Sequence, residues 1–283
     1  MNNGKILDYT LDKMRKIVDK CQCSLTHSKK YELNLDKGEI SLLRTTIDNS
    51  FQVTVINNNK KGSITINKTD ETSIEEALKT VVEICENSEA DEAYDIAPLV
   101  ENKEFACGDE EPDLDKMYDL LDQYVKDVNE KYPTIKLMDT AISFIITKKQ
   151  IKNTNGVDLK ETKGIYDFTS LFAAKEKELS SSFNYSGFNV NKLEKDLLSY
   201  GSFKRVLDET TKQIHTQGIK GKFTGDILLT PDCLATIIYF YVHTYLSDMP
   251  LISGTSRLKD KLNEIVASPL FTLHANPRSE EIQ

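Results

Sequence analysis

The chain has 283 residues and a mass of 32.1 kDa; 39% of its residues are apolar, 29% are charged, and the formal net charge is −9. This length allows two or more domains with sizeable cores, and the composition excludes wholesale disorder. The acidic balance, with a pI near 5.1, argues against general nucleic-acid binding, because phosphate contacts require a basic face.

The sequence predicts a cytoplasmic protein. Its first residues contain no apolar signal segment and no small-residue cleavage site. The longest apolar stretch, Leu234–Val242, has about half the length that a membrane-spanning helix needs. The five cysteines are an odd number without a C-x-x-C pair, which indicates reduced thiols: Cys21, Cys23, Cys85, Cys107 and Cys233.

Residues 1–89 are predicted to form an N-terminal α+β domain. Apolar residues at helical spacing predict helices over residues 4–22 and 71–88. Between them lie four strand-like stretches, separated in part by turn signals at residues 36–38 and 58–61. These stretches cover residues 31–35, 39–46, 51–57 and 62–67.

Residues 90–112 are acidic and contain proline, so we expect a linker there, and residues 113–217 are predicted to be a middle α+β domain. The middle domain begins with an amphipathic helix over residues 113–131. A run of strands follows over residues 135–148, 150–154, 159–174 and 176–185, and a long helix is expected over residues 190–213.

Residues 218–283 are predicted to begin a C-terminal domain. A short strand at Asp226–Leu229 precedes a helix that starts at Pro231 and is apolar around nearly its whole circumference, as in a buried or interfacial helix. Leu258, Leu262 and Ile265 predict a further amphipathic helix. The expected fold is therefore α+β: antiparallel sheets with packed helices in two successive α/β domains, followed by the start of a third, β-rich domain.

Several familiar chemistries have little support in the sequence. The acidic run at residues 109–115 lacks the spacing of an EF-hand loop, so it indicates a solvated helix start. No nucleotide-binding glycine motif and no G-x-S-x-G occur. Cys233, in the first turn of the Pro231 helix, is an alternative nucleophile, but it has no evident base partner in the sequence.

Four passages of the chain resemble the TldD/PmbA family, whose active members are zinc-dependent peptidases. These are residues 61–85 (KGSITINKTDETSIEEALKTVVEIC), 153–174 (NTNGVDLKETKGIYDFTSLFAA), 180–187 (SSSFNYSG) and 223–273. In the metal-bearing TldD branch, the helix of the last passage carries His-Glu-x-x-x-His. Counting back from the shared Gly-Thr-Ser at residues 254–256 places Tyr239, Phe240 and Thr244 at those positions. The chain therefore resembles the PmbA (TldE) branch, which has no metal.

The chemistry of these residues supports the same expectation. A hydrolytic zinc needs three protein ligands and an open position for water, whose proton a nearby carboxylate accepts. Tyrosine, phenylalanine and threonine do not supply this set. His243 precedes the second ligand position by one residue, about 100° around a helix. We expect no catalytic residue, no bound metal and no cofactor in this chain.

The resemblance implies a subunit of a TldD/TldE-type metallopeptidase that processes flexible peptides. Zinc is expected only in a TldD-like partner, and this chain is expected not to be catalytic by itself. The partner would be that subunit or a second copy in a dimer, with Tyr239, Phe240 and Thr244 lining the shared chamber. Family members continue past the LFTLHANP passage at residues 270–277, so we expect the chain to stop within the third domain. The family's older label, modulator of DNA gyrase, leaves an alternative: a self-associating, non-enzymatic binding or regulatory protein.

Overall fold

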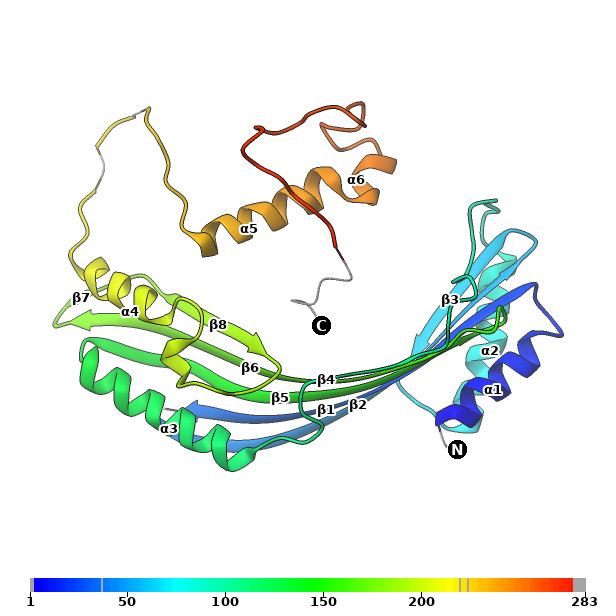
Figure 1. Cartoon of the computed structure of the whole chain (residues 1–283), viewed down its shortest axis with the longest axis horizontal. Coiled ribbons are helices and arrows are strands. Elements are labelled where there is room, and N and C mark those ends of the chain that lie inside the picture. Colours follow the sequence, from blue (N-terminus) through cyan, green and yellow to red (C-terminus); the bar gives the residue numbers. More distant parts are fainter. Residues whose placement is uncertain (1–2, 37, 219, 223, 277–283) are drawn as a thin grey trace. The chain divides into compact units, whose positions relative to one another are not determined.

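The structure is a computed structural model that describes residues 3–36, 38–218, 220–222 and 224–276. The chain divides into two compact units, Met1–Thr216 (unit 1) and Gln217–Gln283 (unit 2). Each unit is described by itself. Figure 1 shows the element order along the chain.

Unit 1 is built on one large, mostly antiparallel sheet with helices packed against it, which confirms the predicted α+β class (Figure 1). The strand order is β3-β2-β1-β5-β6-β4, and β7 and β8 also pair with β6. The strands are β1 (Lys20–Asp36), β2 (Glu39–Asn57), β3 (Lys60–Ile66), β4 (Glu104–Cys107), β5 (Ile135–Asn153), β6 (Asp158–Glu176), β7 (Leu179–Ser180) and β8 (Asn184–Val190). The helices are α1 (Asn3–Met14), α2 (Glu71–Glu86), α3 (Leu114–Lys131) and α4 (Phe203–Lys212), with 3₁₀ turns η1 (Leu197–Ser199) and η2 (Gln213–His215).

Three strands, β1, β2 and β5, are longer or less interrupted than the sequence pattern predicts. β1 pairs with β2 from Lys20 to Asp36 and with β5 from Gln22 to Leu35, so both of its edges are hydrogen-bonded over most of its length. The polar stretch 26–30, which has no clear apolar alternation, is held extended by these two neighbours. The predicted breaks between residues 46 and 51 and between 148 and 150 are therefore wrong. The predicted first helix, residues 4–22, is too long: α1 ends at Met14, and β1 already begins at Lys20.

The first hydrophobic core lies where α1 and α2 pack on the sheet. Alternate side chains of a strand point to the same face, and Cys21, Cys23 and Leu25 of β1 are all buried there. Asp70 caps α2 by accepting a hydrogen bond from the backbone N–H of Ser73, at 2.9 Å. Burial raises the pKa of the Cys21 thiol to about 12, which is consistent with an inert structural thiol.

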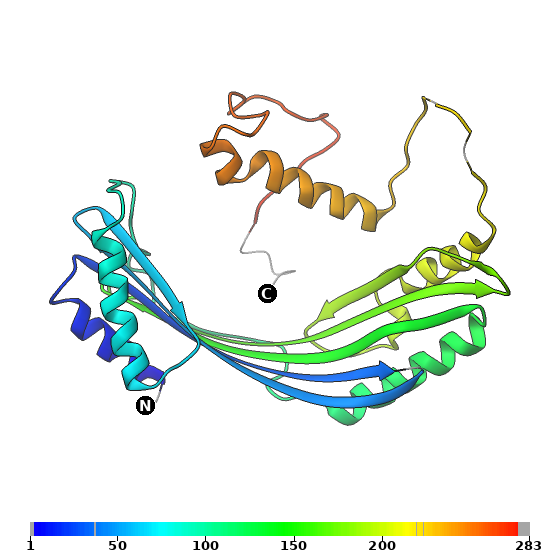
Figure 2. The ribbon, with the colours of Figure 1, turned by 180° about the vertical axis from the view of Figure 1, so that it is seen from behind.

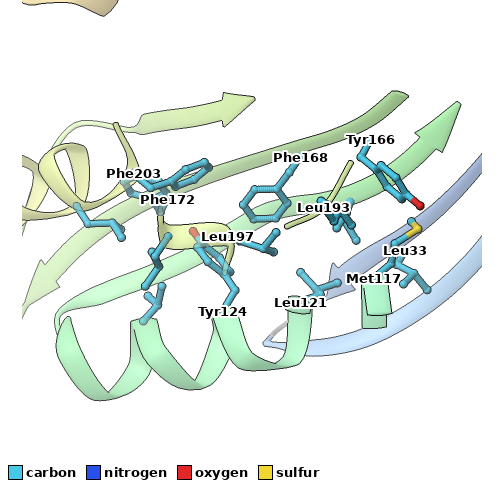
Figure 3. Packing of buried hydrophobic residues seen from close by; sticks show 14 of the residues in the cluster. Leu33, Met117, Leu121, Tyr124, Tyr166, Phe168, Phe172, Leu193, Leu197 and Phe203 are labelled. Carbon is cyan, nitrogen blue, oxygen red and sulfur yellow. The ribbon is translucent and has the colours of Figure 1, made fainter. Parts of the chain in front are cut away.

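The second core lies under α3 and α4, further along the same strands (Figure 3). Tyr124 of α3 meets Phe168 of β6 and Phe203 of α4 edge to face, with ring centroids 5.0 and 5.9 Å apart. Such pairs add about 0.5–1.5 kcal/mol to the burial of the rings. Leu33 of β1 belongs to this core, so one strand contributes to both.

The predicted linker, residues 90–112, contains β4, which adds to β6 as a parallel strand. Asp91 donates its backbone N–H to the carbonyl of Asn59, at 2.8 Å, so the start of the segment also follows the sheet. Composition did not reveal this strand, because only four residues take part and most of their side chains are exposed.

The long helix expected over residues 190–213 is wrong in its first half. β8 extends to Val190, and α4 begins only at Phe203. The hydroxyl of Tyr200 accepts hydrogen bonds from the backbone N–H groups of Glu194 and Lys195, at 2.7 and 3.0 Å, which stabilises a loop there. Gly201 then takes a φ of 53°, a left-handed conformation that a helix does not contain.

Unit 2 contains the helix α5 (Pro231–Tyr241), the π-helical turn η3 (Val242–Leu246) and the helix α6 (Asp248–Ile252). The predicted strand at Asp226–Leu229 is not formed, and the described residues of this unit contain no strand with which it could pair. Residues 257–266 form turns and not the predicted amphipathic helix. Leu262 and Ile265 are 74% and 89% exposed, so no packing stabilises a helix there.

In the described parts of both units, no helix combines the length and the hydrophobicity that crossing a membrane requires.

Candidate functional site

The candidate site lies on the helix that runs from α5 into η3, where the sequence places Tyr239, Phe240 and Thr244. Proline at the first helical position suits the start of α5, because its missing N–H would have no helical partner there. Tyr239 and Phe240 lie in the last turn of α5 and are 67% and 63% exposed. Thr244 lies within η3 and is half-buried.

The π-helical turn changes the spacing of side chains along this helix. The backbone N–H of Ser247 donates to the carbonyl of Val242, five residues earlier, at 2.9 Å. Residues five apart lie about 140° apart around an ideal α-helix, and a π turn reduces this angle. Positions 239 and 244 are five residues apart, so the widened turn brings their directions closer together. Insertions of this kind are common at functional sites.

The Gly-Thr-Ser turn holds the end of this helix in place. Gly254 has a φ of 71°, which favours glycine, and lets the chain turn back after α6. Ser256 is 2% exposed, and its hydroxyl donates to the carbonyl of Tyr245, at 2.7 Å. This bond satisfies a carbonyl at the helix end that would otherwise lack a partner. The Gly-Thr-Ser turn, which served in the sequence only as a reference point for locating the motif positions, therefore has a structural role.

The rings of the helix pair along its surface. Tyr239 and His243 lie with ring centroids 4.2 Å apart, and Tyr241 and Tyr245 with centroids 5.4 Å apart. Both pairs have the i, i+4 spacing that brings side chains together on a helix. His243 thus packs on Tyr239, on the same stretch of helix as the proposed chamber residues. Phe240, next to Tyr239 in the sequence, contributes an apolar ring.

The side chains at positions 239, 240 and 244 offer hydroxyl groups and an apolar ring. None of them is a carboxylate or an imidazole, the groups that bind zinc and accept a proton from its water. Among the residues that the structure describes, no three His, Cys, Asp or Glu side chains gather as a metal site. That the chain binds no zinc stays a prediction. The surface suits contacts with an apolar or aromatic group and hydrogen bonds to a peptide.

A second cluster, which the sequence did not reveal, crosses the face of the unit 1 sheet opposite the helices. Strand register places Arg44, Glu32, Ser143 and Asp167 side by side on β2, β1, β5 and β6. Ser143 is 1% exposed, between the two carboxylates. Lys30 and Arg44 both form ion pairs with Glu32. Only the strand register brings these residues together. The register could not be predicted, because it depends on how strands far apart in the sequence pair.

The two carboxyl groups of this cluster have opposite pKa shifts. Burial alone would raise the pKa of Glu32, but the hydrogen bonds from Lys30, Asn34 and Arg44 outweigh it and lower the pKa. The pKa of Asp167 is raised, first by burial and then by the charge of Glu32, against the effect of Lys30. Relative to the unfolded chain, the sheet therefore favours the ionised form of Glu32 and disfavours the ionised form of Asp167.

Comparison with protein-family models found a match to the first part of the chain. The model of the family described as "PmbA/TldA metallopeptidase domain 1" matches residues 21–85, which span β1, β2, β3 and most of α2. Residues 21–85 therefore match a first domain of the TldD/PmbA family. The resemblance seen in the sequence is confirmed, and the family is metallopeptidase-like. A search of the curated proteins by sequence found no match.

Solved structures described as TldE or as modulators of DNA gyrase share the fold. TldE from Thermococcus kodakarensis superposes with a TM-score of 0.56 at 13% identity, over 74% of this chain and 47% of that one. A modulator of DNA gyrase from Thermotoga maritima gives 0.56 at 12%, over 75% and 47%. A protein with the same label from Bacteroides thetaiotaomicron gives 0.67 at 16%, over 94% and 62%. The chain thus spans about half to three fifths of the length of these TldD/PmbA structures.

Proposed function

We propose that this TldD/PmbA chain is a TldE-like, metal-free subunit of a cytoplasmic peptidase and that it works with a zinc-bearing TldD-like subunit on flexible peptides. The observation that carries the proposal is the set of side chains at the metal-motif positions of a chain with a TldD/PmbA first domain. Tyr239, Phe240 and Thr244 lie on a helix that contains a π turn and ends in a Gly-Thr-Ser turn hydrogen-bonded to it. One of the solved structures similar to this chain is itself described as TldE.

In this proposal, the chain contributes surface rather than proton transfer. Tyr239 and Phe240 present exposed rings, and Thr244 adds a hydroxyl, on one wall of the chamber. Aromatic and apolar walls hold a peptide by burying its side chains, while the partner's zinc activates water. The chain itself therefore lacks a catalytic residue and needs no cofactor.

The test compares the chain alone, a TldD-like subunit with intact His-Glu-x-x-x-His, and the two mixed. We expect the two proteins to copurify, stoichiometric zinc only in the TldD-like subunit, and cleavage of an unstructured peptide only by the mixture. Replacing the glutamate of the partner's motif by glutamine is the control and should abolish cleavage. Stoichiometric zinc together with peptidase activity in this chain alone would contradict the proposal.

The contribution of the Tyr239 and Phe240 rings is tested in the same mixture of the two subunits. Tyr239→Ala and Phe240→Ala should raise the KM for the peptide without removing zinc from the partner. Tyr185→Ala is the matched control, because Tyr185 is a 75% exposed tyrosine that is not among the three residues assigned to the chamber. If the chain binds no such partner, self-associates and leaves peptides intact, the alternative of a non-enzymatic binding protein is favoured.

A further inference from the structure

The outer edge of β2 is a feature of unit 1 that the proposed function does not use. β1 covers one side of β2 along its whole length, but β3 covers the other side only from Phe51 to Asn57. Within the described part of unit 1, residues 39–50 therefore have no neighbouring strand on the outer side (Figure 2). Such an edge presents unpaired backbone N–H and C=O groups to another extended chain.

The β1–β2 register shifts once along this edge, at Ser41, and beyond that shift residues 42–50 carry few of the devices that usually prevent strand pairing. Residues 39–50 read EISLLRTTIDNS and contain no proline, glycine or lysine. Leu43 and Ile47 lie on the face that α3 covers, yet they are 55% and 56% exposed at the edge. By contrast, β3 starts with two lysines, and β4 and β7 are four and two residues long. A partly apolar edge of nine residues, 42–50, with no proline, glycine or lysine, indicates an interface.

The charges of the edge favour a second copy of the same strand as the occupant. In an antiparallel pair of two copies centred on Thr46, Thr46 of one copy lies opposite Thr46 of the other. The residue numbers of any two opposite residues then add up to 92. Arg44 of each copy then lies opposite Asp48 of the other, and Leu43 lies diagonal to Ile47. Opposite charges directly across a strand pair stabilise it. Pairing about Thr45 would instead place Arg44 opposite Thr46, so that neither Arg44 nor Asp48 would face an opposite charge.

We propose that residues 42–50 of β2 form the interface between two copies of this chain, paired antiparallel about Thr46 into one continuous sheet. Arg44 then lies between Glu32 of its own chain, with which it already forms an ion pair, and Asp48 of the second copy. The pairing also covers part of Leu43 and Ile47. The inference does not depend on the proposed peptidase role, because it rests on the sheet edge alone.

The test uses the position where the two copies meet. Thr46→Lys places two ammonium groups opposite each other, and Thr46→Glu places two carboxylates there. We expect each variant of the full chain to raise the dimer dissociation constant at least about tenfold in sedimentation velocity. An equimolar mixture of the two should regain the affinity of the wild type, because unlike charges then meet.

The control is Gln52→Lys, on the same strand and also exposed, but where β3 covers the edge; it should leave the dimer unchanged. The far-ultraviolet circular dichroism spectrum should be the same for every variant, which shows that each one folds. If Thr46→Lys alone fails to fold, Asp48→Lys tests the same register, because it places an ammonium opposite Arg44.

Each of the following results would overturn the proposal: a wild-type chain that is monomeric at its highest soluble concentration, Thr46 variants that dimerise like the wild type, or a mixture that fails to restore association. Capture of an extended peptide along residues 39–50 by a monomeric chain would do the same.

Discussion

The carboxylate of Glu32 is held by charges that come from its own strand and from the next one. Its side chain is 7% exposed, while the side chains of its partners Lys30 and Arg44 are 38% and 57% exposed. Because the cations remain partly in water, losing the carboxylate does not leave them buried and unpaired. What is lost is a set of charge-assisted hydrogen bonds inside the sheet.

We therefore expect Glu32→Gln to lower the free energy of unfolding by about 1–2 kcal/mol at pH 7. The folded state lowers the pKa of Glu32, so its contribution is complete above the unfolded value, near 4.3, and is lost as the pH falls through the folded value. The difference in free energy of unfolding between wild type and variant, measured by urea unfolding, should therefore disappear at acidic pH. A gap that stays constant from neutral to acidic pH would contradict this account.

Asp167, two strands away, should behave in the opposite way. Its pKa is raised in the folded state, so its ionised form weakens the fold at neutral pH, and this penalty disappears as the pH falls toward the unfolded value near 3.9. Asp167→Asn should raise the free energy of unfolding at pH 7 by roughly 0.5 kcal/mol and have a smaller effect at low pH. The measurement is the difference in urea midpoint at both pH values. A loss of stability at pH 7 would show that Asp167 is needed in its ionised form.

At the scale of the elements, β3 packs closely against α2 at Gly62. A Cβ added there would lie 2.2 Å from the carbonyl oxygen of Val81 and 2.8 Å from the backbone nitrogen of Cys85. Both are backbone atoms of α2, so a side chain at position 62 would have to push the helix away from the sheet. Glycine is thus required by packing, because this residue does not have a positive φ.

Gly62→Ala should lower the free energy of unfolding by about 1–3 kcal/mol, the range seen when a packed core is overfilled. The matched control is Gly4→Ala in α1, where an added Cβ meets nothing within 4 Å, and which should leave stability unchanged or slightly higher. Thermal unfolding followed by circular dichroism measures both. Equal stability of Gly62→Ala and the wild type would mean that α2 is not packed as closely as described.

At the scale of the whole molecule, the hydrophobic cores lie in unit 1. Both clusters of buried apolar residues fall between residues 6 and 214. In the described part of unit 2, the one buried residue is Ser256, while Ile227, Leu228 and Ile252 are more than 80% exposed. Burial of apolar surface is the main force that stabilises a fold, so the stability of this chain resides in unit 1.

We expect a polypeptide of residues 1–216 to fold by itself, with a Tm within about 4 °C of the full chain. It should also bind less of a dye that reports exposed apolar surface, because the exposed apolar residues of unit 2 are gone. Calorimetry and dye fluorescence measure the two effects. A shortened chain that no longer unfolds cooperatively would show that unit 2 contributes to the core.

The sequence determined the existence and type of most elements of unit 1. Helical spacing of apolar residues identified the helices that became α2 and α3 nearly to the residue, because their buried faces repeat over several turns. The substitutions at positions 239, 240 and 244 could also be read without a structure, since they depend on residue type and spacing alone. Domain boundaries at residues 89, 112 and 217 stay predictions.

Only the tertiary structure decided the features that depend on contacts between segments far apart in the sequence. The polar middle of β1 became strand because β2 and β5 hydrogen-bond to it on both sides, and local sequence does not report such neighbours. The amphipathic segment at residues 258–266 did not become a helix, because the described residues bury neither Leu262 nor Ile265. The free edge of β2 and the row from Arg44 to Asp167 exist only through strand register. Residue types specify which structures a segment can adopt, and pairing and burial by the rest of the chain decide which one it does adopt.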